Sequence, residues 1–200
     1  MNLAKLASPL NWRHRNNDRL PQFFLLTDVH RLADPSEVLA RMPRGGAVIL
    51  RHPDRIELAR LARRVIPRAH RFGLKVLLAG DARLAIRLGA DGAHLSEAQA
   101  RRGPLRLAKA KPDFLITAAA HSRRALWRAT RAGADLSLLS PVFASVSHPG
   151  AHSLGVLRFL GVAQSSPVPV VALGGITHKN ARRLRADGVW GLAAIGAWRD

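Results

Sequence analysis

The sequence predicts an α/β protein that folds as a single (β/α)8 TIM barrel, and three observations support this prediction. Eight short apolar segments alternate with helix-like segments along the chain. These segments are apolar throughout, as expected of parallel strands that are covered on both faces. The joint Gly-Ala-Asp precedes a strand at Gly89–Asp91 and again at Gly133–Asp135. A doubly wound open sheet is the alternative fold, but the first strand lacks the G-x-G-x-x-G turn typical of it.

The first half of the chain supplies four of the expected strands. They cover Gln22–Asp28, Gly46–Arg51, Leu74–Ala79 and Gly92–Leu95. We expect helices over 34–42, after the N-cap candidate Asp54, and over 82–88. Pro67 interrupts the second of these helices, so a kink or break is expected there, because proline has no backbone N–H to donate.

The second half supplies the other four strands. They cover Phe114–Ala118, Asp135–Ser140, Pro169–Ile176 and Val189–Ile195. Helices are expected over Ser122–Ala132 and 153–162, and Thr177 opens a charged, helix-like segment. Only four residues follow Gly196, so we expect the last helix of the barrel to be cut short.

Glycines end the last two strands, at Gly174-Gly175 and at Gly196. A buried strand followed by glycines and a helix start directs backbone N–H groups toward one point, which suits a phosphate. The last two strands of a (β/α)8 barrel are also where such folds usually hold a phosphate. The alternative is that these glycines only make tight turns.

The composition limits the classes of partner. The chain has 32 Lys and Arg residues against 13 Asp and Glu, a net charge of +19, which favours phosphorylated or nucleic-acid ligands. The basic residues are spread along the whole chain, however, and there are four Trp, six Phe and no Tyr for stacking on bases. A solvated basic surface is therefore expected, and binding of nucleic acid is not.

The absence of certain segments points to the cytoplasm. No apolar run approaches the length needed to span a membrane, and the N-terminus is too polar for a secretory signal. The chain has no cysteine, which excludes disulfides and cysteine-based metal sites. Residues 1–20 are expected to form a basic leader and residues 21–200 the barrel domain.

Six motifs, spread over about residues 22–198, resemble the thiamine phosphate synthase and TenI (thiazole tautomerase) family. They are Leu88–Leu95, Ala120–Ser122, Ser140–Phe143, Leu154–Gly155, Ala172–Thr177 with Asn180–Ala181, and Ala194–Ala197. The resemblance implies a role in thiamine biosynthesis. The family's synthase is a transferase that joins a magnesium-bound pyrimidine pyrophosphate to a thiazole phosphate, whereas its tautomerase moves a proton on the thiazole phosphate itself.

The resemblance implies that the thiazole-phosphate half of the site is kept. Gly174 and Gly175 match the family's phosphate-binding glycines, and Ile195-Gly196 matches its last-strand Ile-Ser without the hydroxyl. In the loop after the sixth strand, Ser145 and Ser147 keep hydroxyl groups, and His148 stands where the family has a lysine. We therefore expect a small phosphorylated substrate, a thiazole phosphate, at these seven residues.

By the same comparison, the half of the site for pyrophosphate and magnesium is eroded. Arg51 is kept, but Pro53 replaces a lysine that would face the pyrophosphate. Asp81 matches one magnesium-binding carboxylate, and Gln99 replaces the other. Ala119 replaces a serine on the pyrimidine side. Because Mg²⁺ prefers carboxylate oxygens, the loss of one of two weakens the case for this cofactor.

His121 is the candidate acid–base residue, and Arg51, at the carboxyl end of the second strand, is the other catalytic candidate. It follows the fifth strand, where the family's tautomerase places its histidine, and an imidazole suits proton transfer near neutral pH. Synthases also carry histidine here, so His121 alone does not separate the two activities. Asp81 can equally be a helix cap, and His94, inside a strand, is expected to be a satisfied core histidine.

Three hypotheses follow from the sequence. The first is a divergent enzyme of the family that binds a thiazole phosphate and has tautomerase-like or weak synthase activity. The second is a non-catalytic barrel that senses a phosphorylated ligand. The third, a nucleic-acid binder, would show steeply salt-dependent binding. The sequence leaves the oligomeric state open.

Overall fold

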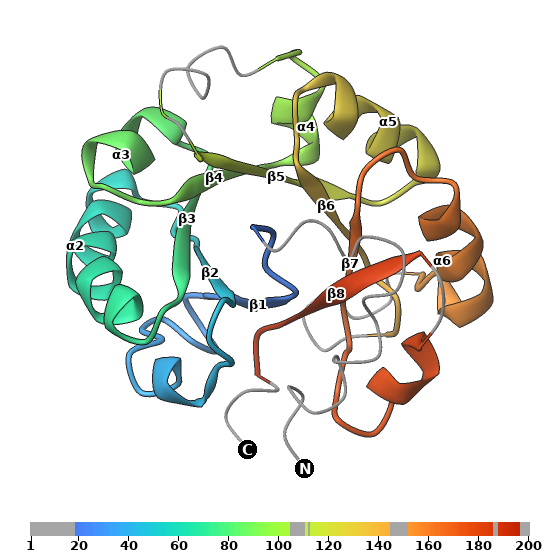
Figure 1. Cartoon of the computed structure of the whole chain (residues 1–200), viewed down its shortest axis with the longest axis horizontal. Coiled ribbons are helices and arrows are strands. Elements are labelled where there is room, and N and C mark those ends of the chain that lie inside the picture. The colour runs from blue at the N-terminus through green and yellow to red at the C-terminus, as the bar shows by residue number, and fades with distance from the viewer. Residues whose placement is uncertain (1–18, 105–110, 112, 145–151, 186–187, 197–200) are drawn as a thin grey trace.

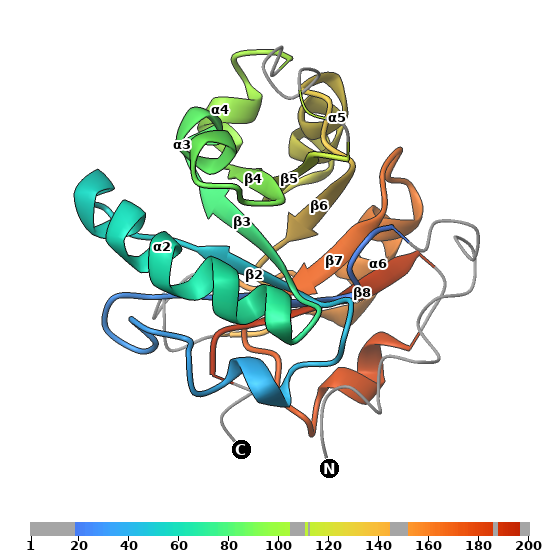
Figure 2. The ribbon, with the colours of Figure 1, turned by 60° about the vertical axis from the view of Figure 1, so that its left-hand side comes forward.

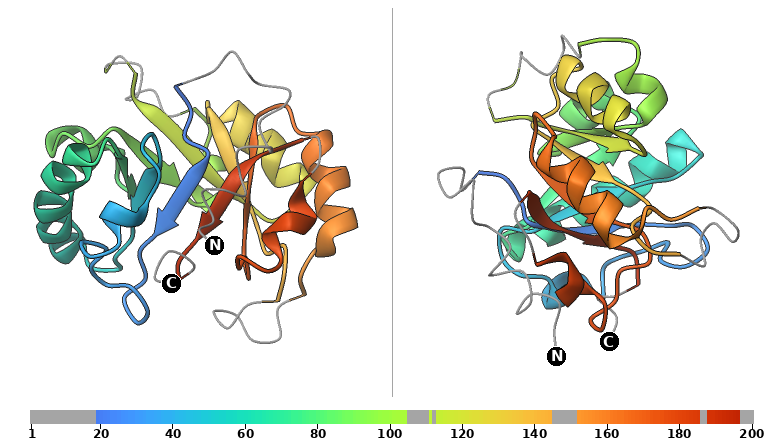
Figure 3. Two further views of the ribbon diagram at one scale, coloured as in Figure 1. Left: turned by 60° about the horizontal axis from the view of Figure 1, so that its bottom comes forward. Right: turned by 90° about the vertical axis from the view of Figure 1, so that its right-hand side faces the viewer.

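A computed structural model describes residues 19–104, 111, 113–144, 152–185 and 188–196. Eight parallel strands close into a barrel in chain order, β1 to β8 (Figure 1). The ring closes where β1 pairs with β8, and Figure 3 shows these two strands side by side. The prediction of a single (β/α)8 barrel is confirmed, and the open doubly wound sheet is excluded. Most of the expected leader, residues 1–18, lies outside the described residues.

All eight expected strands are present, within one to three residues of the expected bounds at most ends. They are β1 (Phe23–Leu26), β2 (Ala47–Leu50), β3 (Lys75–Ala79), β4 (Gly92–Leu95), β5 (Leu115–Ala120), β6 (Leu136–Leu139), β7 (Val170–Leu173) and β8 (Val189–Ala194).

Two hydrophobic cores explain why the strands are apolar throughout. One core consists of strand residues such as Phe24, Ile49 and Leu77, which point into the barrel. The other joins alternate strand residues to helix residues such as Leu61 and Leu126. Because successive strand side chains point to opposite faces, both faces of each strand are buried.

Helices cover the outside of this barrel (Figure 1). They are η2 (Leu39–Arg41), α2 (Arg55–Arg71), α3 (Ala82–Arg87), α4 (Glu97–Ala100), α5 (Arg123–Arg131), α6 (Gly155–Gln164) and η4 (Ala181–Leu184). Figure 2 shows α2 lying across the outside of β2 and β3. Asp54 caps α2 as expected, accepting hydrogen bonds from the backbone N–H groups of Ile56 and Glu57.

Two expected helices are single 3-10 turns instead. The segment 34–42 contains only η2, and the charged segment after Thr177 contains only η4. In the first, the Asp34 carboxylate accepts a hydrogen bond from the backbone N–H of Ser36, and Pro43 follows. The structure also contains a helix that was not expected, α4.

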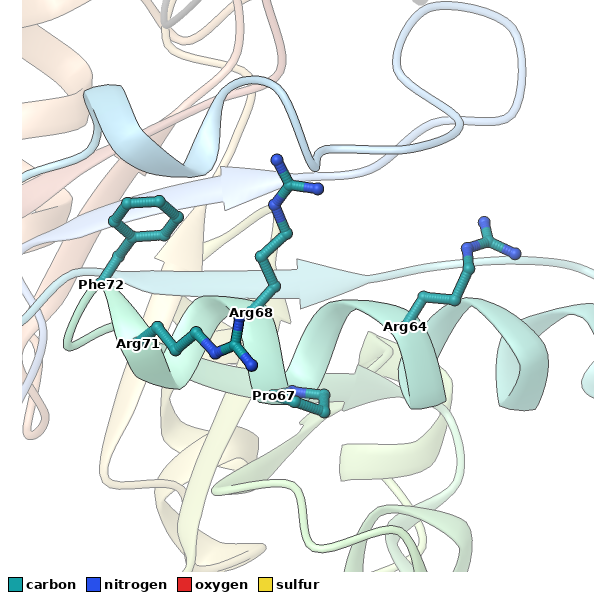
Figure 4. A pocket seen from close by; sticks show the side chains of 5 residues that line it. All are labelled: Arg64, Pro67, Arg68, Arg71 and Phe72. Carbon is teal, nitrogen blue, oxygen red and sulfur yellow. The ribbon is translucent and has the colours of Figure 1, made fainter.

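The expected break at Pro67 is wrong, because α2 continues from Arg55 to Arg71. Pro67 lies on the exposed side of the helix, among the arginine side chains shown in Figure 4. On the opposite side Leu61, Val65 and Ala69 are buried against the barrel. This burial offsets the one backbone hydrogen bond that proline removes.

The repeated Gly-Ala-Asp joint has a structural role. Gly89 and Gly133 end α3 and α5 with φ of 75° and 84°, a conformation that favours glycine. The aspartate two residues later then bonds the neighbouring strand. Asp91 Oδ2 accepts from the backbone N–H of Val76 at 2.7 Å, and Asp135 Oδ2 accepts from that of Ile116, also at 2.7 Å.

Candidate active site

The expected site residues that the structure describes gather at one end of the barrel, which we call the mouth. Each follows the carboxyl end of a strand, which is where barrels of this class carry their active sites. In strand order they are Arg51 after β2, Asp81 after β3, His121 after β5, Gly174 and Gly175 after β7, and Ile195 and Gly196 after β8.

His121 is held by Glu97, a residue that the sequence analysis missed. The distance from His121 Nδ1 to Glu97 Oε2 is 2.9 Å, and the histidine side chain is 57% exposed. Glu97 begins α4, whose first turn is fixed by a capping box between Ser96 and Gln99. When the Nδ1–H group donates a hydrogen bond to the carboxylate, Nε2 is the ring nitrogen that can exchange a proton with a ligand. The Ser-Glu-Ala-Gln sequence after β4 was the available signal for this helix start.

Arg51 is anchored to the end of β1. Its Nε donates to the carbonyl oxygen of Thr27 at 2.8 Å, and one terminal nitrogen lies 3.4 Å from Asp28 Oδ2. Arg31 reaches the same carboxylate oxygen at 3.2 Å. Burial lowers the pKa of Arg51, Asp28 opposes this effect, and Arg31 adds to it. The guanidinium is thus a fixed positive charge at the mouth.

His94 lies buried, as the sequence analysis expected of a satisfied core histidine. It is 7% exposed, and its Nδ1 is 2.8 Å from the Thr117 hydroxyl oxygen. Burial, with a smaller effect of the Arg51 charge, lowers the pKa of His94 to about 4. The imidazole is therefore neutral at physiological pH.

Gly174 and Gly175 pack directly against the segment that follows β6. Their φ angles are 100° and 63°, both in the region that favours glycine. A Cβ atom on Gly174 would lie 2.7 Å from Pro141 Cα, and one on Gly175 would lie 2.9 Å from Phe143 Cβ. Close packing and positive φ angles are therefore sufficient reasons for glycine at both positions, as the tight-turn alternative expects.

The other phosphate candidates differ in their surroundings. A Cβ atom on Gly196 would meet no atom of the described residues within 4 Å. Ser145, Ser147 and His148 lie outside the described residues. Ala144, the residue before this loop, lies beside the glycines: its carbonyl oxygen would clash with a Cβ placed on Gly175.

Asp81 and Gln99 do not fit a magnesium ion. Asp81 Oδ1 accepts from the backbone N–H of Leu84 at 2.8 Å, and Oδ2 accepts from Arg55 Nε at 2.6 Å. The side-chain amide of Gln99 donates to the carbonyl oxygen of Gly80 at 2.7 Å, and its oxygen accepts from the backbone of Ser96. Within the described ranges, no three His, Asp or Glu side chains are grouped so as to hold a metal ion.

Comparison with known proteins gives a consistent result. The family model described as thiamine monophosphate synthase matches residues 23–198. The thiamine-phosphate synthase of Bacillus velezensis is 30% identical over 200 residues, covering 94% of this chain and 88% of the relative. That of Thiobacillus denitrificans is 34% identical over 157 residues, covering 78% and 71%.

A solved structure agrees in fold. Thiamine phosphate pyrophosphorylase from Pyrococcus furiosus superposes with a TM-score of 0.72 at 23% identity, covering 90% of this chain and 88% of that one. In the part of the chain that the structure describes, no helix has the length and apolar character to cross a membrane.

Proposed function

The chain belongs to the thiamine monophosphate synthase family, and from this premise we propose that it is a thiamine-biosynthetic enzyme that binds a thiazole phosphate and moves a proton on it. Synthase turnover, in this proposal, is slow or absent. The observation that carries the proposal is the pairing of His121 with Glu97 at the mouth of the barrel.

The pair supplies what a proton shift on a thiazole ring requires. His121 Nε2 takes a proton from one ring position and returns it to another, so the ligand changes in structure but not in composition. The Glu97 carboxylate, 2.9 Å from Nδ1, stabilises the imidazolium formed between these steps. The exposure of His121 leaves it within reach of a ligand bound in the mouth.

The phosphate of the ligand is proposed to lie above the ends of β7 and β8. Gly174 and Gly175 bring backbone close to this place, and no atom of the described residues lies within 4 Å of a Cβ placed on Gly196, which leaves room for the anion. The proposal assigns Ser145, Ser147 and His148 to the same phosphate, since their loop starts beside Gly175. This arrangement matches the usual phosphate site of the fold.

On the other half of the mouth, the groups that the family's synthase uses for magnesium and for the departing pyrophosphate are in part replaced. Asp81 and Gln99 use their polar atoms in contacts within the protein, and Arg51 is tied to Thr27 and Asp28. Pro53 provides no charge where the family has lysine. Oriented positive charge opposite a departing pyrophosphate is worth several kcal/mol in a transition state, so its loss slows that step by orders of magnitude.

A non-catalytic sensor of a thiazole phosphate is the second candidate. The hydrogen bonds of Asp81, Gln99 and Arg51 within the protein favour it, because they would hold the mouth in shape even without a catalytic role. A sensor would bind thiazole phosphate and leave it unchanged.

Two assays on the parent protein and three variants separate these functions. We expect solvent proton exchange into thiazole phosphate in the parent, its loss in His121→Ala, and little pyrophosphate release in any protein. His30→Ala is the matched control, because His30 is an exposed histidine after β1 at the same mouth. Pyrophosphate-releasing activity that survives His121→Ala but fails in Arg51→Ala would reject the proposal. Binding without exchange would identify a sensor.

A further inference from the structure

Arg55 holds the carboxylate that the family resemblance assigns to magnesium. Its Nε lies 2.6 Å from Asp81 Oδ2. Arg55 is the first residue of α2, and Asp81 is the N-cap of α3, so the ion pair bridges the loops that follow β2 and β3. Burial acts to raise the pKa of Asp81, but hydrogen bonds from Leu84 and Arg55 and the charges of Arg55 and Arg87 outweigh it, and the pKa is lowered.

A metal ion at this place would have to displace protein contacts. It would compete with a guanidinium for Oδ2 of Asp81, and Gln99, which stands in the place of the second carboxylate, donates its amide to the carbonyl oxygen of Gly80. Mg²⁺ requires several oxygen ligands in near-octahedral geometry. The residues present supply one carboxylate that is already neutralised.

The same side of the mouth has an excess of positive charge. Four arginines, Arg31, Arg51, Arg55 and Arg87, interact there with two aspartates, Asp28 and Asp81. These residues follow β1, β2 and β3, which are neighbours in the barrel. The Arg55 side chain is 63% exposed, and its pairing with Asp81 uses Nε, so the terminal nitrogens remain accessible to an anion.

We propose that Arg55 takes the place of a magnesium ion and binds a diphosphate or phosphate group directly, with Asp81 holding the guanidinium in position. Guanidinium groups bind phosphate oxygens through two parallel hydrogen bonds, which a metal is not needed to support. This inference goes beyond the proposed function, because it concerns the β2–β3 side of the mouth and a second anion. Binding at this subsite is therefore independent of divalent metal.

Calorimetric titration with inorganic pyrophosphate tests the proposal. The parent protein should bind with the same affinity in EDTA and in excess Mg²⁺. Arg55→Gln should weaken binding by about tenfold or more, as expected for loss of a charge-assisted pair. Arg60→Gln is the matched control, since Arg60 lies on the same helix, is 64% exposed and is paired with Glu57. It should change the affinity by less than about twofold.

Two further variants separate the arginine from a metal. Asp81→Asn keeps a helix cap but removes the carboxylate, and pyrophosphate binding in EDTA should persist within a few-fold. The double variant Arg55→Gln with Gln99→Asp should recover binding only when Mg²⁺ is present. Binding by the parent that requires Mg²⁺, or an Arg55→Gln affinity equal to that of Arg60→Gln, would overturn the proposal. The readout is binding of pyrophosphate without a thiazole phosphate, so a failure here is distinguishable from a failure of the proton-exchange assay.

Discussion

At the scale of single residues, the mouth is held together by side chains that are far apart in the sequence. Glu97 and His121 are separated by 24 positions, and Arg55 and Asp81 by 26. In each pair the two residues follow neighbouring strands, so the barrel brings them together. Each side chain alone reads as an ordinary surface charge, and its partner is visible only once the strand order is known.

Glu97 should matter for turnover more than for binding. Replacing it by Gln removes the charge that stabilises the imidazolium of His121, so kcat for proton exchange should fall by about 10- to 100-fold with KM little changed. Glu37→Gln, an exposed carboxylate on the β1–β2 connection, is the control. A Glu97→Gln enzyme with the parent's kcat would show that the carboxylate has no part in the reaction.

His94 should make the stability depend on pH. Its pKa is about 4 in the folded state and 6.5 in the unfolded state, so the unfolded chain binds the proton more readily. The stabilisation is complete above pH 6.5 and is lost as the pH falls toward 4, by about 3 kcal/mol at most. Urea unfolding across this range should show a smaller decrease for His94→Gln, while His30→Gln follows the parent. Parallel pH profiles for parent and His94→Gln would contradict this.

Gly196 and Gly175 should respond differently to substitution. Gly196→Val should fold normally and bind thiazole phosphate about tenfold more weakly, because its side chain would occupy the proposed phosphate site, where no described atom lies within 4 Å of a Cβ. Gly175→Ala should lower the melting temperature, because φ is 63° and Phe143 is too close. Gly161→Val, in open space on α6, controls for the added bulk. Undiminished affinity in Gly196→Val would place the phosphate elsewhere.

At the scale of secondary structure elements, the joints between helix and strand carry the information that repeats in the sequence. Gly89 and Gly133 turn the chain at positive φ, and Asp91 and Asp135 then tie the new strand to its neighbour. The pattern predicted strand starts correctly because it records these hydrogen bonds. The helix after Thr177 was overestimated. The Thr177 and Asn180 side chains accept hydrogen bonds from each other's backbone N–H groups, as at a helix start, but only the 3-10 turn η4 follows.

The aspartate joints should contribute to stability. Asp135→Ala removes the acceptor for the backbone N–H of Ile116 and should lower the free energy of unfolding by about 1 kcal/mol. Glu57→Ala, which removes only a surface ion pair on α2, should change it by less than about 0.5 kcal/mol. Urea denaturation measures both. Equal effects of the two substitutions would show that the joint hydrogen bond adds nothing.

The sequence predicted the barrel well and the site only in part. Strand positions follow from apolar runs, which both cores require, so they were readable without tertiary information. Arg55 and Glu97 were missed because their roles depend on contacts across strands, and the uninterrupted α2 was missed because burial of Leu61 and Val65 outweighs the effect of Pro67. Sequence patterns reflect contacts between residues that are close in the chain, whereas the contacts at the mouth join residues that are far apart in it.

At the scale of the whole molecule, the net charge of +19 comes from basic residues that are spread along the whole chain. One example is the outer side of α2, where Arg64, Arg68, Arg71 and Phe72 line a shallow pocket with Pro67 (Figure 4). Arg64 is paired with Asp34 there. Such dispersed charge raises the encounter rate with phosphorylated ligands and selects none of them.

Any association with nucleic acid should therefore be nonspecific. Fluorescence anisotropy with labelled duplex DNA should show affinity that falls steeply with added salt and does not differ between unrelated sequences. A sequence preference that persists at physiological salt would instead support the nucleic-acid hypothesis.

The order of the strands also bears on how the protein is made. Each strand from β1 to β7 pairs with the next one along the chain, and the remaining pairing, between β1 and β8, joins the two ends of the sheet. During synthesis on the ribosome, the growing sheet therefore keeps two unpaired apolar edges until almost all of the polypeptide has emerged. Such edges invite pairing with other nascent chains. The closed ring that protects the finished protein thus leaves its unfinished precursor dependent on rapid completion or on chaperones.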